Sequence, residues 1–410
     1  MFGYALAMFS FRSRHPRLTA AGLLALLLAA AAGVHAEPFV PSGDDTALES
    51  RYDGPSPEFE ALRGKARELA RHPEDVAAAA EVARGFLRLA RRDADSRLAG
   101  YAQAALRPWW TAHEPPGELL FLRASLRQTL HQFDPALADL QIYLARPRLL
   151  PRERAQALLT RSTVLTVLGR FQEAASDCAA LPDAPDRAVR LLCSAQAQAG
   201  GSGAPRTLRV LALYFRQGGF ASDPALRRWG DLILGELAAR QGESALAADA
   251  FQAALREDAG DSYSLAAYAD FLLDQDHAAE VRDLLSDRLQ ADGLLLRHAI
   301  ALRRLGDARA AQEADMLAAR YAAARARGDH THKREEARYL LALRADSGAA
   351  LQLAQQNWQV QREPADLRIL AECAEAARDD RTRQLVRDWL RQTGLVDLAS
   401  QSVRTLQPKA

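Results

Sequence analysis

Apolar and small residues recur at helical spacing along most of the chain, and the pattern is clearest between Arg228 and Asp261. There it predicts one helix, a turn at Gln241–Gly242 and a second helix. Gly235 lies in the first helix, and Ala247 follows in the second, twelve residues later. Two antiparallel helices pack closely only where the facing residues are small. The stretch therefore predicts a helical hairpin whose helices meet at Gly235 and Ala247.

The same spacing of two small residues around a turn recurs along the chain. The five pairs are Ala124 with Ala136, Ser162 with Ala174, Gly235 with Ala247, Ala269 with Val281, and Ala299 with Ala311. No segment shows the alternation of a strand, and the abundant alanine, leucine and arginine favour helix. We predict an all-α chain in which roughly eight helical pairs stack into an α-α superhelix over residues 57–396. A flexible lead-in (37–56) precedes this array, and a polar tail (397–410) follows it.

The unit at Arg228 also fits a known repeat. Counted from Arg228, the small residues fall at the eighth and twentieth positions, Phe251 at the twenty-fourth and Ala254 at the twenty-seventh. In a period of 34 residues, this arrangement resembles the tetratricopeptide repeat family. The resemblance is fair for residues 118–181 and 262–320, and looser towards both ends. It implies a superhelix whose first helices line a concave groove, where family members usually bind proteins or peptides.

The resemblance also implies which residues face the groove. Carried over residue by residue, the groove positions are Trp229, Leu232, Glu236, Arg240, Tyr263, Asp270, Asp274, Leu296, Arg303 and Arg304. Aromatic residues among mixed charges suit a peptide with apolar anchors and charged ends. The alternative is that Trp229 and Tyr263 pack between helices. The asparagine–lysine clamp with which some members bind a carboxyl terminus is not matched, because Glu236, Asp270 and Ile300 occupy those places.

The first 36 residues have the pattern of a secretory signal peptide. Three arginines precede an apolar run from Leu18 to Val34, and no acidic residue occurs before Glu37. We predict cleavage after Ala36 and a periplasmic protein. The alternative is an uncleaved membrane anchor, although the run is shorter than the ~20 residues of a spanning helix. No other segment is long and apolar enough to span a membrane, so no stable span is expected after processing.

Charge and motifs argue against several classes of function. Lys+Arg total 53 against 52 Asp+Glu, so the chain has no overall basic field to hold nucleic acid. His330 and His332 lack the further ligands of a zinc site nearby, and we expect no metal and no cofactor. The chain contains no G-x-S-x-G, no phosphate-binding glycine loop and no H-E-x-x-H, so no enzyme is predicted.

We therefore expect an exported, non-catalytic scaffold that binds an unidentified protein or peptide in its concave groove. Two alternatives stay open at this point. One is an exported helical enzyme that acts on cell-wall glycan, and the other is an assembly factor anchored in the membrane by an uncleaved N-terminal helix. The oligomeric state is open as well.

Export changes the interpretation of the cysteines, because an oxidising compartment permits disulfides. Cys178 is predicted on the second helix of one unit and Cys193 on the first helix of the next. These helices are expected to be antiparallel neighbours, within the ~4–7 Å Cα separation that a disulfide needs. We predict a disulfide between Cys178 and Cys193, with two reduced, buried thiols as the alternative. Cys373 is expected to be a free, buried cysteine.

Alkylation tests this pairing. Mature protein that is unfolded without reductant is expected to react with an alkylating agent at Cys373 alone, because a disulfide protects the other two sulfurs. Mass spectrometry locates the labels. Labelling of both Cys178 and Cys193 would contradict the prediction.

Overall fold

The computed structural model describes residues 56–93, 95, 97–181, 187–220, 223–329 and 331–407. Every regular element within these ranges is a helix, which confirms the predicted all-α superhelical fold. The predicted signal peptide, the lead-in up to residue 55 and His330 lie outside the described residues. Within them, no helix combines the length and the apolar character that crossing a membrane requires.

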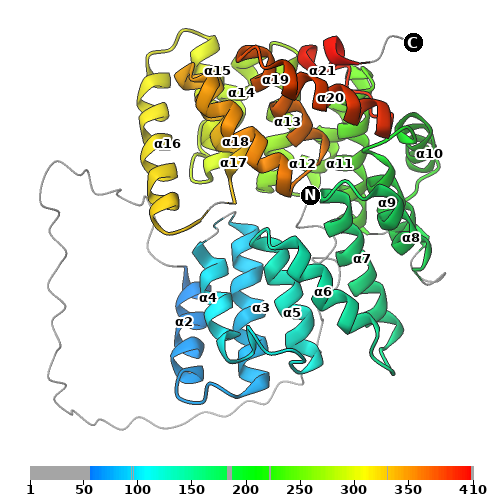
Figure 1. Ribbon diagram of the computed structural model, residues 1–410, viewed down its shortest axis with the longest axis vertical. Coiled ribbons are helices and arrows are strands. Elements are labelled where there is room, and N and C mark those ends of the chain that lie inside the picture. Colours follow the sequence, from blue (N-terminus) through cyan, green and yellow to red (C-terminus); the bar gives the residue numbers. More distant parts are fainter. Residues whose placement is uncertain are drawn as a thin grey trace, which may run out of the picture.

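The described helices follow one another as nine pairs (Figure 1), where roughly eight were expected. The first pair is α3 with α4, because α3 packs more extensively on α4 than on α2. The pairs are α3 (Val76–Arg92) with α4 (Arg97–Ala105), α5 (Gly117–Thr129) with α6 (Phe133–Leu144), α7 (Pro151–Val167) with α8 (Phe171–Ala179), α9 (Arg187–Gln198) with α10 (Ala204–Arg216), α11 (Pro224–Arg240) with α12 (Ser244–Glu257), α13 (Ser262–Asp274) with α14 (Ala278–Leu285), α15 (Asp292–Arg304) with α16 (Arg309–Ala326), α17 (Lys333–Tyr339) with α18 (Ser347–Val360), and α19 (Pro364–Ala376) with α20 (Asp380–Thr393). Helix α2 (Pro57–Leu69) precedes the pairs, and α21 (Gln401–Leu406) follows them. A 3-10 turn, η1 (Arg107–Trp109), follows α4, and a π turn, η2 (Leu340–Arg344), follows α17.

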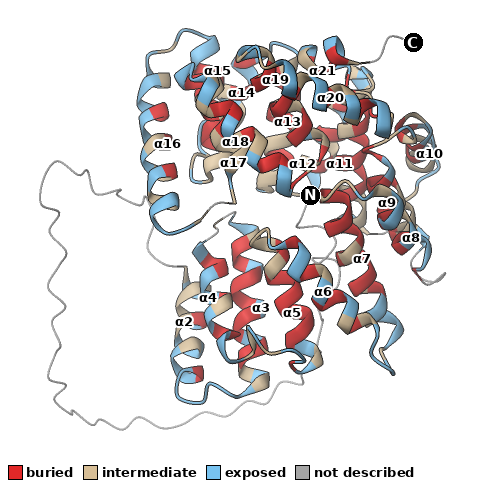
Figure 2. Ribbon diagram, in the orientation of Figure 1, coloured by how far each residue is buried: buried red, intermediate tan, exposed pale blue. Residues whose placement is uncertain are grey.

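The first helices of the pairs form the inner layer of the superhelix. Each first helix, from α3 to α17, contacts the first helix of the next pair, and each second helix, from α4 to α18, contacts the first helix that follows it. Because first helices approach one another closely, they lie on the inside of the curve and the second helices on the outside. Figure 2 shows the buried residues on the helix faces that meet within and between these pairs.

Small residues set the close approach within the pairs, as the spacing predicts. Gly235 of α11 lies against the ring of Phe251 on α12, and a Cβ atom at Gly235 would come within 2.9 Å of that ring. Its predicted partner Ala247 is fully buried. The pairs that begin at Ala124, Ser162 and Ala269 are buried at both positions as well.

The prediction that Ala299 and Ala311 face each other is wrong for Ala311. Ala299 is buried, but Ala311 is exposed, and Ala314 lies in the core in its place. Helix α16 begins three residues after the turn glycine Gly306, whereas α12 begins two residues after Gly242. The buried face of α16 is formed by Glu313, Ala314, Leu317 and Tyr321, and Ala311 does not lie on it.

Six of the first helices end in one common turn. In α5, α7, α11, α13, α15 and α19, the second residue after the helix has a positive φ, and the next amide donates to the carbonyl five residues earlier. This is the Schellman motif. The residues with positive φ are His131, Gly169, Gly242, Asp276, Gly306 and Arg378. The shared turn gives consecutive pairs the same geometry, which a regular stack requires.

The superhelix closes on itself. After the curve from α7 to α19, the chain segments that flank α19 and α20 bind the ends of α7, α9 and α11 by main-chain hydrogen bonds. The bonds run from Arg362 N–H to Val167 O at 2.7 Å, from Ser202 N–H to Thr393 O at 2.9 Å, and from Leu398 N–H to Arg240 O at 2.8 Å. The segment between α20 and α21 therefore meets the end of α11, where Leu398 also lies beside Gly242.

The side chain of Trp389 seals this closure. It lies on α20, directly over Gly169, where an added Cβ would come within 2.6 Å of the indole ring. Phe171 meets the same ring edge-on at a centroid distance of 6.4 Å, and Arg362 lies over it at 5.7 Å. Helix α20 is therefore packed on the turn between α7 and α8, more than two hundred residues earlier in the chain.

The segment predicted as a polar tail contains the last helix of the array. Val403 and Leu406 of α21 are buried, and α21 packs against α19. The prediction missed it because only these two apolar residues in the helix mark the buried face. Ser400 begins α21 by accepting a hydrogen bond from the amide of Val403.

A disulfide joins the second helix of one pair to the first helix of the next. Cys178 of α8 and Cys193 of α9 are bonded, with their Cα atoms 5.5 Å apart. The closed loop spans a sequence separation of 15 residues, for which the loop-closure model gives about 3 kcal/mol of stabilisation. Cys373 is a free cysteine inside α19, and burial raises the pKa of its thiol to about 12.

The contact at Gly235 can be tested against a glycine with no neighbours. Gly235→Leu is expected to lower the free energy of unfolding by about 1–3 kcal/mol, because the new side chain displaces the ring of Phe251. Gly64 lies in α2, and a Cβ atom added there would have no neighbour within 4 Å, so Gly64→Leu is expected to raise stability slightly through helix propensity. Denaturant unfolding measures both. Equal effects would contradict the packing described for α11 and α12.

Candidate partner-binding hollow

The inner faces of the first helices enclose a hollow of about 3780 Å³. Every first helix from α3 to α19 contributes to its lining. The predicted groove positions can therefore be placed relative to one continuous surface. They divide into core residues, residues of internal polar networks, and residues outside the lining.

Trp229, Leu232 and Leu296 lie in the core and not on the groove surface. They are 2%, 1% and 0% exposed, respectively. The indole N–H of Trp229 donates to Gln196 Oε1 of α9 at 3.1 Å. The curve of the inner layer turns these positions towards the neighbouring first helices. The alternative prediction, that Trp229 packs between helices, therefore holds. The prediction that these three residues lie on the groove surface is wrong.

Glu236, Arg240 and Tyr263 do line the hollow. The hydroxyl of Tyr263 donates to Glu236 Oε1 at 2.7 Å. Burial, together with the charge of Glu236, raises the pKa of Tyr263 well above its usual value, so the hydroxyl keeps its proton. Arg240 Nη2 donates to the carbonyl of Ala199 at 3.3 Å. These side chains join α9, α11 and α13 along the inner face.

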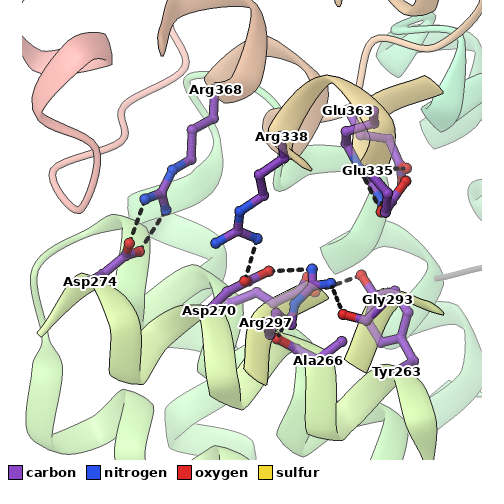
Figure 3. A network of polar contacts seen from close by, with 12 residues as sticks. Tyr263, Ala266, Asp270, Asp274, Gly293, Arg297, Glu335, Arg338, Glu363 and Arg368 are labelled. Carbon is purple, nitrogen blue, oxygen red and sulfur yellow. Dashed lines mark hydrogen bonds and ion pairs between the residues drawn. The ribbon is translucent and has the colours of Figure 1, made fainter. Parts of the chain in front are cut away.

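Asp270 and Asp274 bind arginines from later helices (Figure 3). Asp270 accepts from Arg297 of α15 at 2.6 Å and from Arg338 of α17. Burial alone would raise the pKa of Asp270, but the two arginines outweigh it and hold that pKa well below its usual value. Asp274 accepts from Arg368 of α19, with Nη1 at 2.5 Å. There, burial prevails over the single arginine and raises the pKa of Asp274.

Arg303 and Arg304 lie at the end of α15, outside the lining of the hollow. Arg303 Nη1 donates to the carbonyl of Leu343 at 2.6 Å, and Arg304 Nη1 donates to the carbonyl of Leu273 at 2.5 Å. Both therefore satisfy carbonyls near the ends of neighbouring helices. The structure does not place Arg303 and Arg304 at the groove surface, where the resemblance predicted them.

A second polar network surrounds Arg334 at the start of α17, and sequence reasoning missed it. Arg334 binds Glu335 at 3.0 Å and Asp366 of α19 at 3.2 Å, and Asn357 donates to Asp366 at 2.8 Å. Burial would raise the pKa of Glu335, but Arg334 lowers it to about 2. The acidic start of α17 is thus a buried contact between helices. Arg334 and Arg338, four residues apart on one helix face, are the signal that could have indicated it.

The lining of the hollow is divided by charge. Lining residues up to 156 are called the basic half here, and those beyond 156 the acidic half. Among the described residues, the basic half carries eight arginines, Arg84, Arg88, Arg91, Arg92, Arg97, Arg146, Arg148 and Arg152, against four carboxylates, Asp93, Asp95, Glu118 and Glu153. The acidic half carries nine arginines against twelve carboxylates. An anionic ligand is therefore favoured at one end of the hollow.

The chain has been compared with known proteins. No protein-family model matches it, and no curated protein does so either. Among the described residues, no group of three or more His, Cys, Asp or Glu side chains is arranged to hold a metal ion. The class that the fold and the site define is an all-α superhelix with a charged inner hollow.

The Asp270 network leads to a prediction about stability and pH. Asp270→Asn is expected to lower the free energy of unfolding by about 2–3 kcal/mol at pH 7, because it leaves Arg297 and Arg338 without their shared carboxylate. The folded-state pKa of Asp270 is depressed, so its contribution is present above the unfolded pKa of about 4 and is lost as the pH falls below that value. Denaturant unfolding at pH 7 and pH 3 measures the difference between variant and wild type.

The control is Asp283→Asn, which removes a carboxylate bound to Arg282 at the exposed surface. No measurable change is expected there, because exposed ion pairs contribute little. A difference for Asp270→Asn that stays constant between pH 7 and pH 3 would contradict the assignment.

Proposed function

We propose that the protein is an exported, non-catalytic scaffold that holds a protein or peptide segment in its inner hollow. The observation that carries this proposal is the hollow itself, which has a volume of about 3780 Å³ and is lined by every first helix. A rigid concave surface binds an extended partner without the entropic cost of ordering loops. We also propose, from the period at Arg228–Asp261, that the array is built from tetratricopeptide-like repeats.

The basic half of the hollow is the better binding surface. In the acidic half, Asp270 and Asp274 are bound by arginines from α15, α17 and α19, and these pairs are largely buried. In the basic half, the pair of Arg84 with Glu118 is more than half exposed on both sides. Exposed pairs contribute little to stability, so a ligand can replace them. The functional surface thus lies on α3, α5 and α7, away from the positions that the family resemblance implied.

Apolar side chains accompany the charges in the basic half. Leu150, just before α7, lines the hollow and is 62% exposed, whereas Leu87 of α3 and Leu122 of α5 border it as buried residues. Such a mixture suits a partner segment that combines apolar anchors with acidic residues. The disulfide at Cys178 supports a protein that works in an oxidising compartment, in agreement with the predicted signal peptide and periplasmic location.

Site-specific cross-linking tests the proposal. A photo-cross-linking amino acid is placed at Gln156, which lies on α7 and lines the hollow, and the full chain is expressed in its own host. We expect one discrete heavier product after irradiation. The matched control places the same group at Ser176, which is exposed on α8 outside the hollow.

The control position is expected to give no such product. The proposal fails if the same product forms from both positions. It also fails if Gln156, and a second lining position at Gln312 of α16, give no product in the host.

A further inference from the structure

Arg91 differs from the arginines around it. It lies in the last turn of α3 and lines the basic half of the hollow. Its Nε and Nη2 atoms are buried, and neither has a hydrogen-bond partner among the described residues. Neighbouring arginines on the same helix do have partners: Arg84 binds Glu118, and Arg88 binds Glu58. Arg91 is therefore a partly buried cation that no carboxylate of the described chain compensates.

An uncompensated guanidinium is unfavourable inside a protein. Removing a charge from water costs several kcal/mol unless an opposite charge and hydrogen bonds replace the lost hydration. Burial lowers the pKa of Arg91 to about 10, and no nearby carboxylate opposes that shift. The side chain still carries its charge at neutral pH. An anion that enters the hollow would supply the missing interaction.

A purely structural explanation is weaker. A cation in the last turn of a helix is favoured by the helix dipole, and Arg91 occupies that position in α3. The contribution of the dipole is small, however, and is less than the penalty of burying the charge. The Nε and Nη2 atoms also form no hydrogen bond with the helix carbonyls of the described chain. The surplus of arginine over carboxylate in the basic half points to an anionic ligand as well.

We infer that Arg91 anchors a carboxylate of an acidic peptide segment in the basic half of the hollow. This inference rests on the proposed function and names the chemistry of the partner. Arg146, on the chain between α6 and α7, and Arg152, at the start of α7, extend the positive lining beyond this anchor. Further acidic residues of the segment lie along them, while its apolar residues contact Leu150, which lines the hollow and is 62% exposed.

The test uses a fluorescent hexaglutamate peptide and the full chain at low ionic strength. Wild type is expected to bind hexaglutamate and not hexaglutamine or hexalysine, as measured by fluorescence anisotropy. Arg91→Met is expected to weaken the binding by about tenfold or more, since a charged hydrogen bond to the peptide is lost. The same variant is expected to unfold at an equal or higher denaturant concentration without peptide, because an uncompensated charge has been removed.

Arg148→Met is the matched control. It removes one positive charge from the same lining at an exposed residue, and we expect a loss of less than about threefold, the effect of long-range attraction alone. A measurement without any variant complements it: hexaglutamate raises the thermal midpoint of wild-type protein, and hexaglutamine does not. This second readout stays decisive if Arg91→Met does not fold.

The outcomes separate this inference from the proposed function. If Arg91→Met destabilises the protein and leaves hexaglutamate binding unchanged, Arg91 is structural and the inference fails. If wild type binds no hexaglutamate while the cross-link from Gln156 still forms, the partner is not acidic, and only the inference fails. If no peptide binds and no cross-link forms, the proposed function fails with it.

Discussion

Asp274 of α13 and Arg368 of α19 form an ion pair, although they are 94 residues apart in sequence. The carboxylate is only 8% exposed, and both terminal nitrogens of the guanidinium bind it. Such a pair holds only if α13 and α19 keep one fixed separation, because breaking it would leave a buried charge without a partner. The curvature of the superhelix between these helices is thereby fixed.

Closure by main-chain hydrogen bonds extends this constraint to the rest of the array. In an open solenoid each unit contacts only its neighbours, so the stack can bend. Here the segments around α19 and α20 bind the ends of α7, α9 and α11. Arg338 of α17 and Arg368 of α19 reach the inner face of α13, where they bind Asp270 and Asp274. In the basic half, by contrast, the pair of Arg84 with Glu118 is exposed, and the buried Nε and Nη2 atoms of Arg91 have no hydrogen-bond partner among the described residues.

Local features of this fold follow from the sequence, and long-range ones do not. The burial of Gly235 and Ala247 follows from their spacing, because it depends on contacts within one hairpin. The positive φ values of His131 and Asp276 were not predicted, since only glycine signals that conformation reliably. The burial of Trp229, the network at Arg334 and the closure depend on how tightly the whole array curves. The resemblance of one unit to a known repeat assigns residues to a face of its helix. The curvature of the whole array decides which other helices that face contacts.

Native-state hydrogen exchange of three amides tests the closure most directly. The amides of Ser202, Arg362 and Leu398 all lie outside helices and donate to carbonyls far away in sequence. If the superhelix closes as described, these amides exchange at least about a hundredfold more slowly than unstructured amides, because exchange requires the closure to open. Exchange of all three at the rate of an unprotected chain would contradict a closed superhelix and, with it, a hollow of fixed shape.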